Sequence, residues 1–423
     1  MSQDAQVIVV GAGPAGSTAA TYLARAGVDV LLLEKTTFPR EKVCGDGLTP
    51  RGVKQLIDLG IDTSRDAGWV HSRGLRILTG ELTLELDWPE LTSYPPYGVA
   101  RTRQDFDDLL ARTAVKAGAR LQERTTVTGA ITDERTGRVV GVEAKTGEDK
   151  RPVSYRAPLV LACDGVSARL ALSAGIEKNE KRPMGVAVRR YYRSPRHDDE
   201  FIEGHLELWD RSDPRRPKLL PGYGWAFPLG DGTVNVGLGM LSTSAAFRNT
   251  DYRALLRTWL DSTPAEWGYR EENAVGRIGG AGLPMGFNRT PHYRAGLLLL
   301  GDAGGMVSPF NGEGISAAME SAQLAAEHVV QALARPEGPS RERALSGYPR
   351  ALAELMGGYY RLGNLFAKAI GKPAVMRAAT KYGLRVNALI PLVYKGLSGC
   401  YDASGGDGVD RLISLLAKAT PSA

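Results

Sequence analysis

The segment from Gln6 to Gly27 constrains the fold of this chain more than any other stretch of the sequence. The segment of residues 6–10 is short and mostly apolar, and most of its residues are β-branched. This pattern indicates a buried strand of a parallel sheet. A glycine-rich run follows at once, and it consists of Gly11, Ala12, Gly13, Pro14, Ala15 and Gly16. Residues 17–26 have helical spacing, so we expect a strand, a tight turn and a helix in this order.

The residues of this turn have separate roles in a dinucleotide-binding site. Gly11 permits the tight turn, Gly13 lets the backbone approach a pyrophosphate, and Gly16 lets the helix pack closely on the strand. Pro14 and Ala15 lead into the helix, whose N-terminus supplies free N–H groups and a dipole that attract phosphates. The run therefore predicts a site for a dinucleotide.

A second apolar strand, residues 28–33, completes the βαβ unit and ends at Glu34. A carboxylate at this position accepts hydrogen bonds from ribose hydroxyls and disfavours a 2′-phosphate. Glu34 therefore belongs to the predicted site, although the motif alone does not distinguish NAD from FAD.

A second strand, loop and helix late in the chain favours FAD. Residues 297–300 are all leucine and lead into Gly301 and Asp302, and a helical pattern begins after Gly314 and Ile315. This second strand–loop–helix segment has no function in a simple NAD-binding domain. In FAD enzymes an acid placed like Asp302 holds the ribityl chain, and glycines let backbone N–H groups approach the flavin ring at a helix N-terminus. FAD is therefore the expected cofactor.

Composition predicts a soluble protein of two or three domains. The chain has 423 residues, a hydrophobic fraction of 43% and a net charge of +6, and one domain usually takes roughly 100–200 residues. The Lys and Arg residues are spread along the chain without a nucleic-acid motif, so no nucleic-acid partner is expected. A mildly basic surface reflects either ordinary solvation or attraction to anionic lipid or an acidic partner.

The cysteines Cys44, Cys163 and Cys400 are far apart and lack the spacing of metal ligands, so we expect neither disulfides nor a metal site. The N-terminus has no basic segment and no cleavage site of a signal peptide. No apolar stretch reaches the about 18 residues of a membrane span. We expect a cytoplasmic protein that is peripheral on the inner face of the cell membrane.

Three motifs together resemble the para-hydroxybenzoate-hydroxylase-like superfamily of FAD enzymes. They are GAGPAG near the N-terminus, ACDGVSA around Asp164, and GDAGGMVSPFNGEGI at residues 301–315. The resemblance implies that Asp164 and Asp302 contact the cofactor. It also implies that Arg103, in an R-x-x-F-D segment, is a cofactor contact that can pair with a phosphate, and that Val127 lies beside the adenine.

Two further motifs resemble the geranylgeranyl reductase branch, whose members saturate double bonds of polyprenyl chains. KVCGDGL at residues 42–48 and YGWAFP at residues 223–228 carry this likeness, which extends over about residues 5–400. It implies flavin contacts from a loop that consists of Cys44, Gly45, Asp46 and Gly47. Cys44 is either a small buried side chain or a group that packs on the ring and touches the reacting alkene.

Three aromatic side chains alternate with small residues on one predicted strand. Tyr223, Trp225 and Phe227 share one face, while Gly224 and Ala226 leave the other face nearly bare. Such a stripe either packs in a core or lines a pocket. A polyprenyl chain has no hydrogen-bonding groups and is held by apolar area alone, which favours the pocket. We therefore predict Tyr223, Trp225 and Cys44 as catalytic residues. The Tyr223 hydroxyl is the predicted source of a proton.

The predicted fold is α/β, with a Rossmann-type FAD-binding domain, an inserted antiparallel β-sheet substrate domain and a C-terminal helical segment. The FAD-binding domain is discontinuous, over residues 1–180 and 275–335. The sheet of residues 181–274 roofs the flavin. Residues 336–423 either pack on the FAD-binding domain or form a surface that enters a bilayer.

The expected activity is FAD-dependent reduction of C=C bonds in a polyprenyl chain. Frequent Gly, Ala and Arg residues are typical of a GC-rich bacterium, which favours the tail of menaquinone over geranylgeranyl diphosphate, ether lipids or chlorophyll. The rival hypotheses are a flavin-dependent aromatic monooxygenase or halogenase, and a flavin- or lipid-binding protein without turnover. The sequence has no second G-x-G-x-x-G motif for a nicotinamide donor, so it does not identify the electron donor to FAD.

Overall fold

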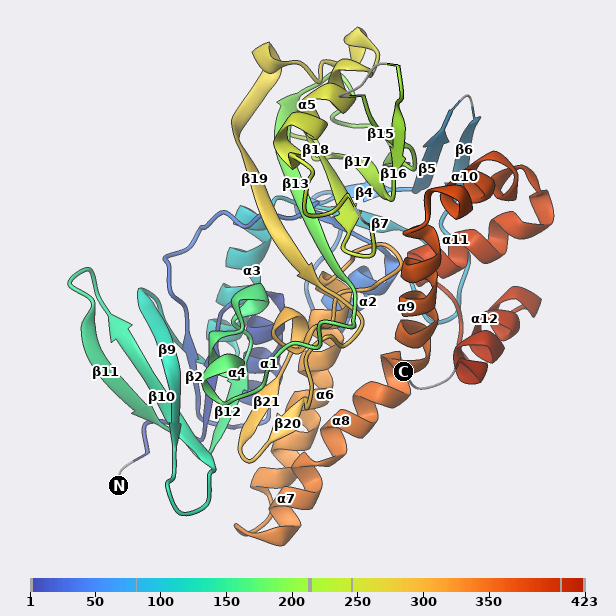
Figure 1. The fold of residues 1–423 in the computed structure, drawn as a ribbon. Coiled ribbons are helices and arrows are strands. Elements are labelled where there is room, and N and C mark those ends of the chain that lie inside the picture. The colour runs from blue at the N-terminus through green and yellow to red at the C-terminus, as the bar shows by residue number, and fades with distance from the viewer. Residues whose placement is uncertain (1–2, 81, 212–214, 245, 404, 421–423) are drawn as a thin grey trace.

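The computed structural model describes residues 3–80, 82–211, 215–244, 246–403 and 405–420. One domain is built on a six-stranded sheet with the order β20-β21-β12-β1-β2-β8 (Figure 1). Neighbouring strands are parallel except for β20, which pairs antiparallel with β21. The strands are β1 (Val7–Val10), β2 (Val30–Leu33), β8 (Arg120–Gln122), β12 (Leu159–Ala162), β20 (Tyr293–Arg294) and β21 (Leu297–Leu299). This sheet confirms the predicted Rossmann-type domain.

Both faces of the parallel sheet are covered, which explains why its central strands are apolar at every position. On one face, Val7 and Val9 of β1 join a cluster with the helices α1 (Pro14–Arg25), α3 (Arg103–Lys116) and α6 (Ile315–Leu333). On the other face, Ile8 and Val10 join a cluster under a three-stranded antiparallel sheet. That sheet consists of β9 (Thr125–Thr132), β10 (Val139–Thr146) and β11 (Arg151–Arg156).

A second, seven-stranded sheet lies above the first in Figure 1, with the order β19-β13-β18-β17-β14-β5-β6. Its pairs are antiparallel apart from β14 with β5. The strands are β5 (Gly74–Thr79), β6 (Leu82–Asp87), β13 (Met184–Arg193), β14 (Phe201–His205), β17 (Gly222–Pro228), β18 (Thr233–Leu241) and β19 (Ala274–Pro284). The sheet therefore extends beyond the expected range 181–274, because it takes β5 and β6 from residues 74–87 and continues to residue 284.

Short elements connect and cover the two large sheets. A small three-stranded sheet carries the segment just after the loop of residues 44–47, and a two-stranded ribbon flanks the seven-stranded sheet. These elements and the connecting helices are β3 (Gly47–Leu48), β4 (Val70–Ser72), β7 (Gly98–Ala100), β15 (Leu208–Asp210), β16 (Lys218–Leu220), α2 (Pro50–Asp58), α4 (Arg169–Ser173) and α5 (Tyr252–Asp261).

The small residues of β17 face α5. A Cβ on Gly224 would lie 2.4 Å from Cζ2 of Trp259 in α5. Ala226 belongs to the same buried cluster as Trp259, together with Val236 and Leu238 of the next strand. The prediction of a nearly bare face was therefore wrong: the small side chains make room for a tryptophan ring.

The C-terminal segment is helical, as predicted, and lies along one side of both sheets (Figure 1). The hydroxyl of Tyr394 donates a hydrogen bond to the carbonyl of Leu86 in β6 at 3.2 Å, and its ring stacks on Trp88. Among the described residues, no helix is both long and apolar enough to cross a membrane. The helices are α7 (Pro339–Leu345), α8 (Gly347–Leu352), α9 (Gly358–Ile370), α10 (Pro373–Lys381), α11 (Ile390–Ser398) and α12 (Gly408–Ala419).

Replacement of Gly224 by valine is expected to lower the free energy of unfolding by about 1–3 kcal/mol, the usual cost of overpacking a core. The added atoms would overlap the Trp259 ring, so α5 or β17 would have to move. Gly408→Ala is the matched control, because a Cβ there meets no atom within 4 Å. Urea unfolding followed by tryptophan fluorescence compares the two, and an equal effect of both substitutions would contradict this packing.

Candidate functional site

Of the three glycines in the turn after β1, only Gly13 faces open space. Gly11 has a φ of +99°, and a Cβ on it would lie 2.4 Å from the carbonyl oxygen of Cys163. A Cβ on Gly16 would lie 1.8 Å from the carbonyl oxygen of Gly11. At Gly13 the nearest atom to an added Cβ is Nη2 of Arg40, at 3.8 Å. The turn itself therefore requires Gly11 and Gly16, whereas Gly13 faces space that a pyrophosphate can occupy.

The helices α1 and α6 of this domain begin without a side-chain cap. α1 begins at Pro14 without an acid in its first turn, and α6 begins after Gly314 in the same way. Their first N–H groups are thus available to an electronegative ligand. Asp302 lies beside the second N-terminus, since a Cβ on Gly314 would be 3.3 Å from its Oδ1. Burial raises the pKa of Asp302, while Lys42 and Arg103 act against the shift.

A chain of four charged side chains runs beside the glycine-rich turn. Glu34 accepts a hydrogen bond from a backbone N–H of the turn at 3.1 Å and one from Arg40 at 3.4 Å. Arg40 also pairs with Asp107 at 2.9 Å. Asp107 in turn accepts two hydrogen bonds from Arg103, at 2.7 and 2.9 Å. Arg103 is therefore a buried partner of Asp107, and Arg40 is the cation beside Gly13.

Sequence reasoning did not select Arg40 or Asp107. The spacing of Arg103 and Asp107 on a predicted helix is that of an i,i+4 ion pair, so the sequence held a signal for Asp107. Arg40 gave no local signal, because it meets Glu34 and Asp107 only through the tertiary fold.

Two buried polar atoms near the turn have no partner among the described residues, namely Nε of Arg40 and Oδ1 of Asp164. Asp164 follows β12, and its other oxygen accepts the N–H of Leu170 at 3.1 Å. Burial raises the pKa of this carboxyl. An unpartnered donor and an unpartnered acceptor beside an open glycine turn fit the phosphates and hydroxyls of FAD. Val127, expected beside the adenine, is buried on β9.

One buried carboxylate holds the loop of residues 44–47 against the seven-stranded sheet. Asp46 has a φ of +68° and no exposed surface. Its Oδ1 accepts the N–H of Arg103 at 3.1 Å, and its Oδ2 accepts hydrogen bonds from Asn235 at 2.7 Å and Tyr191 at 2.8 Å. Burial raises the pKa of this carboxyl to about 6, although hydrogen bonds and neighbouring cations oppose the shift.

The glycines of the same loop fit the ring of Phe227. A Cβ on Gly45 would lie 2.8 Å from that ring, and a Cβ on Gly47 would lie 3.0 Å from it. Cys44 is a half-buried free thiol, and its carbonyl accepts a hydrogen bond from Asn235 at 2.8 Å. The motifs CGDG and YGWAFP are thus two sides of one contact, which gives a physical reason for their occurrence together.

The other two aromatics of β17 continue this contact toward α6. Trp225 is buried and donates its indole N–H to Oδ1 of Asn235 at 3.0 Å. Tyr223 donates its hydroxyl to the carbonyl of Asn311, in the loop before α6. Ring centres along the stripe are 6.1 and 6.3 Å apart. The stripe therefore joins the two loops that were predicted to contact the flavin, residues 44–47 and 311–315.

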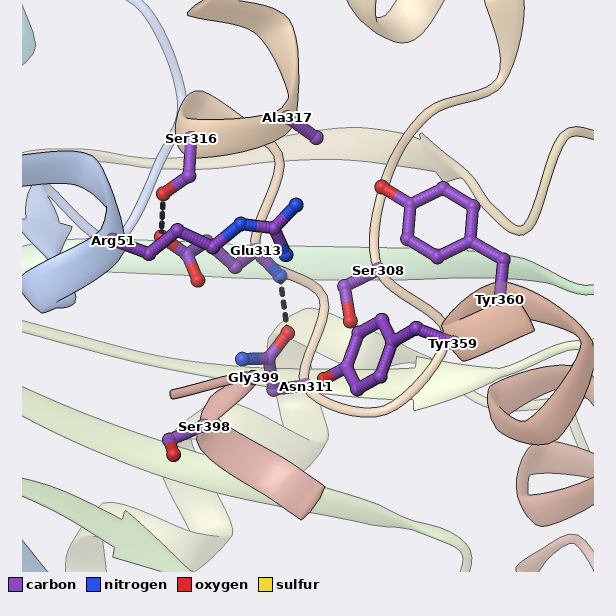
Figure 2. A pocket seen from close by; sticks show the side chains of 10 residues that line it. All are labelled: Arg51, Ser308, Asn311, Glu313, Ser316, Ala317, Tyr359, Tyr360, Ser398 and Gly399. Atoms are coloured by element: carbon purple, nitrogen blue, oxygen red, sulfur yellow. Dashed lines mark hydrogen bonds between the residues drawn. The ribbon is translucent and has the colours of Figure 1, made fainter. Parts of the chain in front are cut away.

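A small polar cavity lies behind the second loop (Figure 2). Its volume is about 10 Å³, which is room for about one water molecule. Glu313 faces it and accepts hydrogen bonds from Ser316 and from Thr49, and burial raises its pKa. Sequence reasoning did not select the lining residues, which are Arg51, Ser308, Asn311, Glu313, Ser316, Ala317, Tyr359, Tyr360, Ser398 and Gly399.

Comparisons with known proteins agree with this geometry. A family described as "FAD binding domain" matches residues 4–203. The chain is 35% identical to a menaquinone reductase of Mycobacterium tuberculosis, over 97% of this chain and 95% of the relative. It is 31% identical to a digeranylgeranylglycerophospholipid reductase of Methanocella arvoryzae, over 84% and 85% of the two chains. The chain belongs to the geranylgeranyl reductase family of FAD-dependent oxidoreductases.

A solved structure has a similar overall fold. A geranylgeranyl bacteriochlorophyll reductase-like protein from Thermoplasma acidophilum superposes with a TM-score of 0.73 at 23% identity, over 93% of this chain and 91% of that one. The likeness covers almost the whole chain and concerns the fold. FAD is the cofactor of this chain, as the sequence predicted.

Gly45→Ala is expected to weaken FAD binding at least about tenfold, a cost of about 1.4 kcal/mol. The added Cβ would overlap the Phe227 ring, so the loop would have to move away from its place. A smaller side chain in Phe227→Leu should remove most of this penalty in the double variant. Quenching of FAD fluorescence on the apoprotein measures all four affinities of the cycle. Equal penalties in both backgrounds would show that the two residues do not interact.

The raised pKa of Asp46 predicts a pH dependence of stability. A carboxyl that titrates near 6 when folded and near 3.8 when unfolded binds more protons in the folded state between these values. The stability it contributes is therefore complete below about pH 4 and is lost as the pH rises through about 6, by up to about 3 kcal/mol. The stability of the wild type minus that of Asp46→Asn, measured by urea unfolding across this range, should fall as pH rises. A flat difference would contradict the assignment.

Proposed function

We propose that this protein reduces C=C bonds in the isoprenoid tail of a lipid, with the tail of menaquinone as the first candidate. The observation that carries the proposal is the aromatic stripe of β17, which contacts both loops beside the FAD site. A tail without polar atoms binds by apolar area, and rigid rings supply that area at low entropic cost. The 35% identity to a menaquinone reductase over almost the whole chain supports the choice of substrate.

In this proposal the cofactor extends from the glycine-rich turn to the N-terminus of α6. Arg40, which faces the open side of Gly13, joins the residues proposed from the sequence as a phosphate contact. The other residues that would hold FAD are Gly11, Gly13, Pro14, Ala15, Gly16, Glu34, Cys44, Gly45, Asp46, Gly47, Arg103, Val127, Asp164, Asp302, Gly314 and Ile315.

The protein positions the isoprenoid tail, excludes water from the site and supplies a proton. Reduced FAD supplies a hydride equivalent to the double bond when it is bound. Trp225 and Phe227 hold the tail and exclude water, and the partly exposed thiol of Cys44 contacts the alkene. Burial raises the pKa of Tyr223, so its hydroxyl stays protonated. We propose it as the proton source for the carbon skeleton. Glu313, whose pKa burial also raises, lies on the loop that Tyr223 contacts.

The reaction needs an external reductant and access to a lipid. Saturation of one C=C bond takes two electrons and two protons, and a separate carrier must reduce FAD. The tail of a quinone or polar lipid lies in a bilayer, so we propose that the protein works at the inner face of the cell membrane. Digeranylgeranyl lipids are the second candidate substrate, because a relative that is 31% identical carries that name.

The test measures the mass of the product. Purified holoprotein is reduced with dithionite in the absence of oxygen and mixed with menaquinone in detergent. We expect the tail to gain the mass of two hydrogens, or a multiple of it, which counts the reduced bonds. The oxidised holoprotein and the FAD-free protein are the controls.

Each alternative product corresponds to a different enzyme. Reduction of an archaeal-type digeranylgeranyl lipid or of geranylgeranyl diphosphate, with menaquinone unchanged, would keep the chemistry and reject the substrate. An aromatic product that gains oxygen in air, with every alkene unchanged, would reject the proposed function.

A further inference from the structure

The excess positive charge of this protein is confined to its C-terminal segment. Residues 355–423 contain nine of the 53 Lys and Arg residues and three of the 47 Asp and Glu residues. Their net charge is therefore +6, which equals the net charge of the whole chain, and residues 1–354 are neutral. Basic residues occur along the whole sequence, but in residues 1–354 they are balanced by an equal number of acidic residues.

The three acids of this segment all have partners within the protein. Asp402 accepts hydrogen bonds from the backbone N–H groups of Thr92 and Ser93. Asp407 and Asp410 both pair with Lys395, each at 2.8 Å. No acid is therefore left in the segment to balance its other cations.

The cations gather around α10. Residues 372–391, which we call the α10 segment, contain four exposed basic residues and no acid, and the basic residues are Lys372, Arg377, Lys381 and Arg385. None of the ion pairs found among the described residues involves these four side chains. At neutral pH this surface carries, within residues 372–385, four positive charges without an ion-pair partner in the described part of the chain.

Large apolar side chains are exposed among these cations. The exposed fractions are 39% for Val375, 62% for Tyr382, 46% for Val386 and 41% for Leu389. α10 itself buries only Met376 and Thr380 against the rest of the protein. A helix with so narrow a buried face, and with apolar and basic residues on the remainder, is typical of segments that lie in a membrane interface.

The α10 segment is connected to the aromatic stripe by packing. Tyr394 of α11, just after the segment, belongs to a hydrophobic cluster with Trp88 that also contacts Phe227. Ala367 and Ile370 of α9, just before it, pack in a cluster with Leu283. Tyr394 donates a hydrogen bond to Leu86 of the edge strand β6, and Figure 1 shows α10 near this edge of the same sheet. The segment thus adjoins the proposed site of the isoprenoid tail.

We propose that the α10 segment is the surface by which this protein docks on an anionic lipid bilayer. The inference rests on the proposed function in one respect, since a substrate in the membrane gives the docking its purpose. Lys and Arg attract anionic headgroups, while Tyr382, Val386 and Leu389 enter the boundary between headgroups and acyl chains. An acidic protein would satisfy the charges but would leave the exposed apolar side chains without the acyl region that suits them.

The test uses the full-length holoprotein and vesicles without substrate. Co-sedimentation is measured with vesicles of phosphatidylglycerol and of phosphatidylcholine, at low and high salt. We expect binding to phosphatidylglycerol at least about tenfold tighter than to phosphatidylcholine, and weaker at high salt because exposed charges are screened. Equal binding to both lipids, or none to either, would overturn the proposal.

Two variants assign the binding to the α10 segment. Replacement of Lys372, Arg377, Lys381 and Arg385 by glutamine should lower affinity for phosphatidylglycerol at least about tenfold. Tyr382→Ser with Leu389→Ser should lower it as well without any change in net charge. The matched control replaces four exposed cations elsewhere by glutamine, and these are Arg65, Lys116, Arg135 and Lys145. An equal loss in the control would show that net charge, not this segment, decides binding.

Activity separates this inference from the proposed function. The four-cation variant should reduce menaquinone in detergent at the wild-type rate and lose activity only on menaquinone in phosphatidylglycerol vesicles. Protein that binds these vesicles but reduces no prenyl chain would overturn the proposed function and keep the docking surface. Protein that reduces the tail in detergent but fails to bind the vesicles would overturn the docking surface alone.

Discussion

The hydrogen bonds of the Asp46 carboxylate are the interaction on which the site depends. They join a loop that leaves the parallel sheet to Asn235 and Tyr191 of the seven-stranded sheet, and to the backbone at the start of α3. A buried carboxylate is costly unless its oxygens are satisfied, so these partners hold the two domains in one relative position. Without that position the aromatic stripe of β17 would not meet the loops beside the FAD site.

The same contact explains why the three aromatic side chains of β17 have different partners. Phe227 packs on two glycines, Trp225 is anchored through Asn235, and Tyr223 bonds to the loop before α6. A wall that is fixed at both ends excludes water and presents a rigid apolar surface, which suits a substrate that offers no hydrogen bonds. The basic and apolar α10 segment at the edge of the same sheet suits the bilayer from which such a substrate would come.

Much of the fold and part of the site followed from local patterns. The βαβ unit, the glycine-rich turn at residues 11–16 and the strand pair β17 and β18 could be predicted because neighbours in sequence form them. The strands β5 and β6 could not, because β5 pairs with β14 across more than a hundred residues of chain and β6 joins the sheet through β5. Arg40, Asn235 and Tyr191 were missed for the same reason: nothing beside them in sequence reveals the carboxylates that they reach.

The sequence by itself determined the class of this protein, since spacing of glycines, acids and aromatics encodes a dinucleotide turn and a family likeness. Only the tertiary structure decided what those residues touch. Gly224 and Ala226 seemed to leave a bare face until α5 placed Trp259 over it. The glycines of CGDG are explained by the ring of Phe227, which packs against them and leaves no room for a Cβ. Side-chain contacts between distant segments depend on packing, and packing is a property of the folded chain and not of any local pattern.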